Sequence, residues 1–103
     1  MGKVKTENKY QRELIRKLER IFPDAIILKN DSGYRQGIPD WSIMNGEHWG
    51  MFDVKKSKDA PHQPNQDWYI NWAASEGHFG MFVYPENEEE FLDAIQQALG
   101  NGR

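Results

Sequence analysis

The sequence has no cysteine, which excludes disulfide bonds and thiolate metal sites. It has no apolar run of the roughly 20 residues that a membrane-spanning helix needs, and residues 1–20 lack the apolar segment of a secretory signal. A Gly-rich phosphate loop and a Ser-His-Asp arrangement are also missing. We therefore expect a cytoplasmic protein with no membrane partner.

The charge of the chain is small but unevenly distributed. The formal net charge of −3 does not favour a nucleic-acid binder. Basic residues outnumber acidic ones in residues 1–20, however, and acids gather in residues 86–93. A local basic surface attracts phosphates even when the whole chain is acidic. With 103 residues, of which 38% are hydrophobic, we expect one domain, 1–103, with a single modest core.

Hydrophobic periodicity and turn residues predict the element order α-β-β-β-α-β-α. Helices are expected at residues 6–22, 65–75 and 85–99, and strands at residues 25–29, 38–44, 48–56 and 79–84. The turn signal Asn45-Gly46 joins the second and third strands into a hairpin. The pattern predicts an α/β (α+β) fold with a mixed sheet flanked by helices.

Each predicted helix has an apolar side that should pack against the sheet. The expected packing residues are Tyr10, Leu14, Leu18 and Ile21 in the first helix, Trp68, Tyr69, Trp72 and Ala73 in the second, and Phe91, Leu92, Ile95 and Leu99 in the last.

Two carboxylates and a lysine lie on the predicted hairpin. Pro39-Asp40 begins its first strand and Asp53-Val54-Lys55 ends its second. Side chains alternate along a strand, so if Phe52 and Val54 face the core, Asp53 and Lys55 face outward into a cleft. Neighbouring acids repel unless a proton or a cation joins them, and hard divalent cations prefer oxygen ligands. We expect metal-assisted attack of water on a phosphodiester here; the simpler alternative is a solvated polar face.

This motif resembles that of the PD-(D/E)xK nuclease superfamily. It stands as Pro39-Asp40, twelve intervening residues, then Asp53-Val54-Lys55. With the order of elements, Glu7 in the first helix and Gln66 in the helix after the hairpin, the chain is similar to the small VRR-NUC-like branch, which includes short phage-borne endonucleases and relatives of Holliday junction resolvases. The resemblance covers residues 6 to about 84. It implies a restriction-endonuclease-like core and, for a phage-encoded chain, the host cytoplasm.

The resemblance also implies a role for each motif residue. Asp40 and Asp53 would ligate Mg²⁺ or Mn²⁺, together with the backbone carbonyl of Val54. Lys55 would position the attacking water or stabilise charge on the phosphate. Gln66 would support the site or contact the phosphate. An Asp stands at position 53, where Glu is commoner in the family, which shortens the reach to the metal.

The family also uses an acid on the first helix, and two residues compete for that role. At 100° per residue, the apolar stripe of this helix centres near the direction of Glu7, whereas Glu13 points more than a quarter-turn away. We expect Glu7 to be the catalytic acid and a further metal ligand, with Glu13 as the alternative. A simpler role for Glu7 is to stabilise the helix dipole from the first turn.

The predicted function is metal-dependent endonucleolytic hydrolysis of DNA. The short chain favours structure-selective or weakly sequence-specific cleavage of duplex or branched DNA, and a homodimer would supply two sites for two strands. The polar loop 32–37 would suit contact with the DNA backbone. The alternatives are a non-catalytic DNA-binding module that retains the nuclease fold, and a structural protein with exposed acids. His48 and His62 match no common zinc signature.

Overall fold

The computed structural model describes the backbone of residues 3–100 and the side chains of residues 8–100. The elements are helix α1 (Lys3–Ile21), strands β1 (Ile26–Lys29), β2 (Trp41–Asn45) and β3 (His48–Val54), helix α2 (Gln66–Ser75), strand β4 (Phe79–Val83), the 3-10 turn η1 (Pro85–Asn87), helix α3 (Glu88–Ile95) and the π-helical turn η2 (Gln96–Gly100). The predicted order is confirmed. The last predicted helix is divided into three helical segments, and β2 begins at Trp41, so Pro39 and Asp40 precede it.

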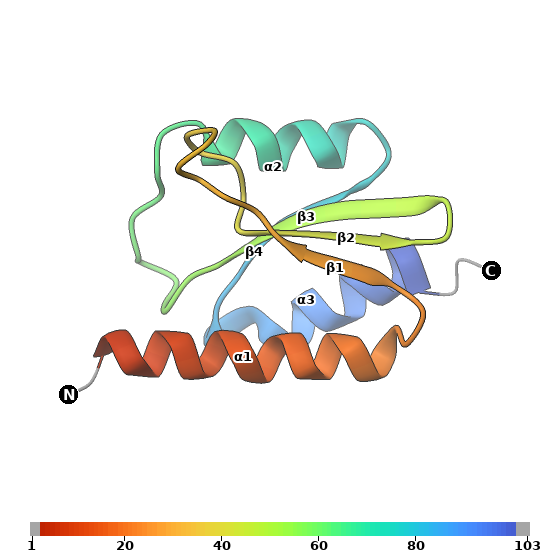
Figure 1. Ribbon diagram of the computed structural model, residues 1–103, viewed down its shortest axis with the longest axis horizontal. Helices are drawn as coiled ribbons and strands as arrows, with labels where there is room; N and C mark the ends of the chain where they lie inside the picture. The colour runs from red at the N-terminus through yellow and green to blue at the C-terminus, as the bar shows by residue number, and fades with distance from the viewer. Residues whose placement is uncertain (1–2, 101–103) are drawn as a thin grey trace.

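The four strands form one mixed sheet in the order β1-β2-β3-β4. β1 pairs with β2 and β2 with β3 in antiparallel fashion, whereas β3 and β4 are parallel. Helix α2 covers one face of the sheet, and α1 and α3 lie on the other (Figure 1). The predicted small α+β arrangement of a mixed sheet between helices is therefore confirmed. Among residues 3–100, no helix is both long enough and apolar enough to cross a bilayer.

A tight hairpin sets the register of β2 and β3. Asn45 pairs with His48, so the turn consists of Gly46 and Glu47. Of these two, only Gly46 has a positive φ, at 66°, which is the pattern of a type II′ turn. This register places Trp41 opposite Phe52, and their rings stack with centroids 6.4 Å apart. The predicted alternation is confirmed, because Phe52 lies in the core.

The hydrophobic core lies between the sheet and helices α1 and α3. Its buried members are Leu14, Leu18, Phe22, Ile43, Phe52, Val54, Phe79, Val83, Phe91, Ile95 and Leu99. Tyr10, Ile21 and Leu92 pack against this cluster. The apolar stripes predicted for the first and last helices are therefore confirmed.

Helix α2 packs on the other face with a side that differs from the predicted one. Its buried residues are Gln66, Ile70 and Ala73, whereas Trp68 is 61% exposed and Trp72 38% exposed. A Cβ atom at Gly80 would lie 2.2 Å from the carbonyl oxygen of Ile70. The helix thus lies too close to β4 for an indole ring to fit between them. The prediction is therefore wrong for Trp68 and confirmed for Ala73. Trp72 lies at the margin of the packing side, where its ring centroid is 5.6 Å from that of Trp49 on β3.

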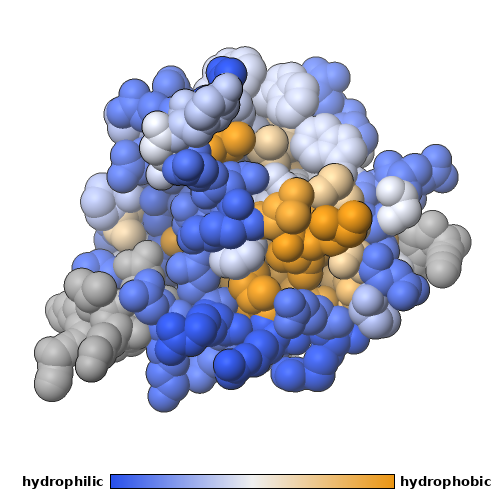
Figure 2. Space-filling model, viewed as in Figure 1, coloured by the Kyte–Doolittle hydropathy of each residue, from blue (hydrophilic) through white to orange (hydrophobic). Residues whose placement is uncertain are grey.

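The face of the sheet that α2 covers at β3 and β4 is open at β1. Ile26 and Leu28 are 57% and 48% exposed there. They lie opposite Met44 and Ser42 in the sheet register. Figure 2 shows a contiguous apolar patch where β1 crosses the front of the molecule. Helix α2 therefore covers only the part of this face on which the polar motif residues of β3 lie.

Gly37 allows the loop before Asp40 to contact the segment before α2. Its φ is 87°, and a Cβ atom there would lie 2.2 Å from the carbonyl oxygen of Pro64 and 2.6 Å from the Cβ of Asn65. Only glycine fits such an approach. The contact brings the chain leading to Asp40 against the residues that lead into Gln66.

We expect Gly37→Ala to lower the free energy of unfolding by more than Gly77→Ala. Both glycines have positive φ, 87° and 85°, so both substitutions incur a backbone cost of about 1–2 kcal/mol. Nothing lies within 4 Å of a Cβ at Gly77, so only Gly37→Ala adds a clash, of about 1–3 kcal/mol. Urea unfolding of the two variants measures the difference, and equal losses would contradict the close packing at Gly37.

Candidate active site

Asp53 is buried at the centre of the polar cluster. Its side chain is 1% exposed, and its Oδ1 accepts hydrogen bonds from the main-chain N–H of Asp40 at 2.8 Å and from Nε2 of Gln66 at 3.1 Å. Its Oδ2 lies 3.1 Å from the Lys55 ammonium. Asp53 and Lys55 point to the same side, as predicted, and both line a pocket. Helix α2 covers that face, however, so both side chains are buried rather than solvated.

Gln66 connects Asp53 to Lys55. Its Oε1 accepts hydrogen bonds from Lys55 Nζ at 2.9 Å and from the main-chain N–H of Gln63 at 2.7 Å, while its Nε2 donates to Asp53. Only one orientation of the amide satisfies these donors and the acceptor together. The side chain is 4% exposed, and its position in the first turn of α2 carries it onto β3. Gln66 therefore holds both charged groups of the motif in place.

The Lys55 ammonium has three N–H donors, and its partners in the cluster accept only two of them. These partners are Asp53 Oδ2 and Gln66 Oε1. The side chain is 11% exposed, and Lys55 lines a pocket of about 200 Å³ together with Asp40, Asp53 and Gln66. The third donor is available to an acceptor in this pocket, such as a water or a phosphate oxygen.

The main-chain carbonyl of Val54 points to the side of β3 on which β2 lies. The N–H of Lys55 donates to Val83 on β4, and main-chain groups alternate between the two sides of a strand. The N–H and the carbonyl of Val54 therefore point to the β2 side. A hydrogen bond from the main-chain N–H of Val54 lowers the pKa of Asp40, which places the two residues together. Val54 also lines the pocket.

Asn30, which the sequence analysis did not single out, positions Asp40. Its main-chain N–H donates to the Asp40 carbonyl at 2.7 Å. Its Nδ2 donates to the Pro39 carbonyl and to Ser42 Oγ, both at 2.9 Å. These bonds join the end of β1 to the start of β2. They fix the backbone on which the Asp40 side chain stands.

Burial and the neighbouring Asp53 raise the pKa of Asp40 above its ordinary value of 3.8. Burial is the larger cause, because it removes water from the charged form. Lys29, Lys55 and the Val54 N–H act in the opposite direction. The ionised Asp40 carboxylate is thus under electrostatic strain, which either a proton or a cation relieves.

The donor set of this pocket fits a hard divalent cation. Two carboxylates and a main-chain carbonyl are all oxygen ligands, and Mg²⁺ is commonly held by one or two carboxylates with several waters. A carboxylate offers about four lone-pair positions, and the neighbours of Asp53 use three of them. Among the described side chains, no three His, Cys, Asp or Glu residues form a group that could hold a metal. Of the described residues, Asp40, Asp53 and the Val54 carbonyl would therefore be the protein ligands, with water in the remaining positions.

The structure describes the side chains of some of the other predicted residues and not of others. Glu7 belongs to α1, but its side chain lies outside the described residues, so its role stays a prediction. Glu13 is exposed on α1. His62 pairs with Asp67 at 2.9 Å. Ser32 in the 32–37 loop lines the pocket, whereas contact between this loop and DNA stays a prediction.

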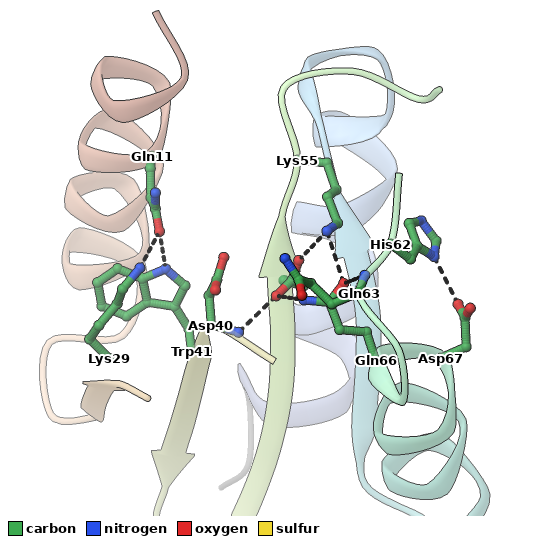
Figure 3. Close-up of polar contacts among 10 residues, drawn as sticks. Gln11, Lys29, Asp40, Trp41, Lys55, His62, Gln63, Gln66 and Asp67 are labelled. Carbon is green, nitrogen blue, oxygen red and sulfur yellow. Dashed lines mark hydrogen bonds and ion pairs between the residues drawn. The ribbon is translucent and has the colours of Figure 1, made fainter. Parts of the chain in front are cut away.

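A second polar group, also missed in the sequence, lies beside Asp40. Gln11 Oε1 on α1 accepts hydrogen bonds from Trp41 Nε1 at 2.6 Å and from Lys29 Nζ at 3.0 Å. Figure 3 shows the Asp40 carboxylate between this group and the Lys55–Gln66 group. No sequence signal marks Gln11, because its partners are 18 and 30 residues away. Asp40 therefore stands where α1, β2 and β3 come together.

No family model matches the chain, and neither does any curated protein or solved structure with which it was compared.

We expect Asp40→Asn and Asp53→Asn to change stability in opposite directions at pH 7 without divalent metal. Asp40→Asn removes a strained charge and should raise Tm. Asp53→Asn removes the partner of the buried Lys55 ammonium, and breaking such a pair costs about 3–5 kcal/mol. Thermal unfolding in EDTA measures both effects. A loss of stability in Asp40→Asn would contradict the proposed strain.

The effect at Asp40 should also depend on pH. Its pKa is higher in the folded chain than in the unfolded one, so protonation of Asp40 stabilises the fold. The cost of the ionised form appears as pH rises from 3.8 through the raised pKa. The advantage of Asp40→Asn over the wild type should therefore shrink as pH falls toward 3.8, and an advantage that is constant across this range would argue against titration of Asp40.

Proposed function

We propose that this chain is a metal-dependent endonuclease of the PD-(D/E)xK type, with a restriction-endonuclease-like core, which hydrolyses phosphodiester bonds in DNA. The observation that carries the proposal is the convergence of Asp40, Asp53 and Lys55 in one pocket. The two acids line the same pocket although they are 13 positions apart in the sequence. A solvated polar face would not bury Asp53 and Lys55 under a helix.

Each residue of the pocket has a role that follows from its contacts. Asp40 and Asp53, with the Val54 carbonyl, would hold Mg²⁺ or Mn²⁺. When bound, the cation supplies Lewis-acid activation of water and neutralises charge on the phosphate. Lys55 would direct its third N–H toward the attacking water or a phosphate oxygen. Glu7 is the proposed additional acid from α1, with Glu13 as the alternative.

Gln66 is proposed as a positioning residue for the reaction. It fixes the Lys55 ammonium and the Asp53 carboxylate through hydrogen bonds of 2.9 and 3.1 Å. Neither charged group can rotate freely while these bonds persist, so the donor of Lys55 and the free lone pair of Asp53 keep their directions. Such preorganisation is a large part of how active sites stabilise developing charge.

The proposed substrate is DNA cut with little sequence specificity. Among residues 3–100, the helices and strands build one sheet and its flanking layers, and none of them forms a separate unit for base recognition. Two strands of a duplex or a branched DNA need two active sites, so we propose that the protein acts as a homodimer. It would work in the cytoplasm, of the host if the chain is phage-encoded.

We expect the wild type to cleave DNA in Mn²⁺ and Lys55→Ala to lose at least about 100-fold in rate. Lys56→Ala is the matched control, because Lys56 is the next residue and is exposed. Linear duplex, single-stranded and four-way-junction DNA are incubated with each protein, and the products are resolved by gel electrophoresis. Cleavage of the junction alone would indicate a resolvase.

Two results of this assay would contradict the proposal. Equal cleavage by the wild type and Lys55→Ala would remove Lys55 from the mechanism. DNA binding by the wild type without any cleavage in Mg²⁺ or Mn²⁺ would favour the non-catalytic DNA-binding module instead.

A further inference from the structure

A groove lies between helix α1 and the end of strand β1, next to the candidate active site. Its volume is about 440 Å³, and its lining includes Arg12, Ile15, Arg16, Glu19, Lys29 and Trp41. It is larger than the pocket that holds Asp53 and Lys55. None of the residues that line the groove also lines that pocket, so the groove is separate from the proposed nuclease motif.

The groove carries an excess of positive charge. Arg12, Arg16 and Lys29 are set against the single acid Glu19 among its lining residues. In the part of the chain whose side chains are described, none of these three cations belongs to an ion pair; the pairs there are formed by Lys17, Lys55 and His62. Unpaired guanidinium groups are well suited to phosphate oxygens, which they bind through two parallel N–H donors.

Arg12 and Arg16 are spaced for a repeating anion. They are four residues apart on α1, so both lie on one side of the helix. The rise of an α-helix separates them by roughly 6 Å along its axis. This is comparable with the separation of neighbouring phosphates along a nucleic-acid strand. Ile15 and Trp41 are the apolar residues of its lining, and they suit the sugar rings between those phosphates.

Lys29 and Trp41 connect the groove to Asp40. Lys29 Nζ lies 3.0 Å from Gln11 Oε1 and 5.0 Å from the centre of the Trp41 ring, and its charge lowers the pKa of Asp40. Trp41 follows Asp40 directly in the chain. Figure 3 shows these residues on the side of Asp40 opposite to Lys55. A strand lying in the groove would thus continue past Asp40 into the proposed active site.

We propose that this groove binds the sugar-phosphate backbone of the DNA strand next to the bond that is cut. Arg12 and Arg16 contact successive phosphates, and Lys29 contacts the phosphate nearest to Asp40. The proposal rests on the proposed function, because the position of the scissile bond beside Asp40 comes from it. It adds a binding surface on α1 that lies outside the Asp40, Asp53 and Lys55 motif.

The test compares Arg12→Ala/Arg16→Ala with Arg20→Ala. Arg20 is an exposed arginine of the same helix, and it is not among the residues that line the groove. Binding of a fluorescent DNA duplex is measured at several salt concentrations, with Ca²⁺ in place of Mg²⁺. For duplex DNA, each lost phosphate contact reduces the slope of log K against log salt by about 0.9. We expect a reduction of about 1.8 for the double variant and no change for Arg20→Ala.

A charge-preserving variant separates binding from folding. Arg12→Lys/Arg16→Lys keeps both cations and should recover most of the salt slope, and far-ultraviolet circular dichroism reports whether each variant is folded. In cleavage assays the alanine pair should raise KM and leave kcat near the wild-type value, because neither arginine touches the reacting atoms. If the lysine pair reduces the salt slope as much as the alanine pair does, the proposed phosphate contacts are overturned.

The outcomes distinguish the two proposals. Slopes that are equal for the wild type and the alanine pair would overturn the groove and leave the nuclease proposal intact. A reduced slope in a protein that cleaves no DNA would support the groove and overturn the nuclease proposal. A wild type that does not bind DNA at all would overturn the groove.

Discussion

The buried carboxylate of Asp53 is the group on which the arrangement of the site depends. It accepts hydrogen bonds from the main chain at Asp40 and from Gln66, and it pairs with Lys55. These partners belong to the loop before β2, to α2 and to the residues that follow β3. A buried charge without partners costs several kcal/mol. The interactions that offset this cost for Asp53 also hold three segments against one another. Gly37 allows this assembly, because it lets the loop approach the start of α2.

The two acids have different surroundings. Asp53 is surrounded by donors, whereas Asp40 has a raised pKa because burial and Asp53 disfavour its charge. A cation bound between the two carboxylates would offset the repulsion that raises the pKa of Asp40. The donor of Lys55 opens into the same pocket, and the cationic groove of α1 begins on the other side of Asp40. The proposed chemistry and the proposed path of the DNA therefore meet at this residue.

Local patterns predicted much of the fold, and long-range packing decided the rest. Alternation along β3 placed Asp53 and Lys55 on one face because a strand has a period of two. Their burial depends on which helix covers that face, and this is set by contacts distant in sequence. Trp68 looked like a packing residue because it is apolar, but it is 61% exposed, because α2 lies too close to β4 at Gly80 for an indole ring to fit between them. Asn30 acts through its position beside β2, which no local pattern encodes.

We propose that Asp40 and Asp53 bind one divalent cation between them, and calorimetric titration of Mn²⁺ into the wild type and Asp40→Asn at pH 7 measures this binding. We expect saturable binding to the wild type and loss of that binding in Asp40→Asn. In unfolding experiments, the wild type should gain about 2.7 kcal/mol of unfolding free energy at 100 times the Kd. No binding to the wild type at millimolar Mn²⁺, or equal binding to both proteins, would contradict this proposal.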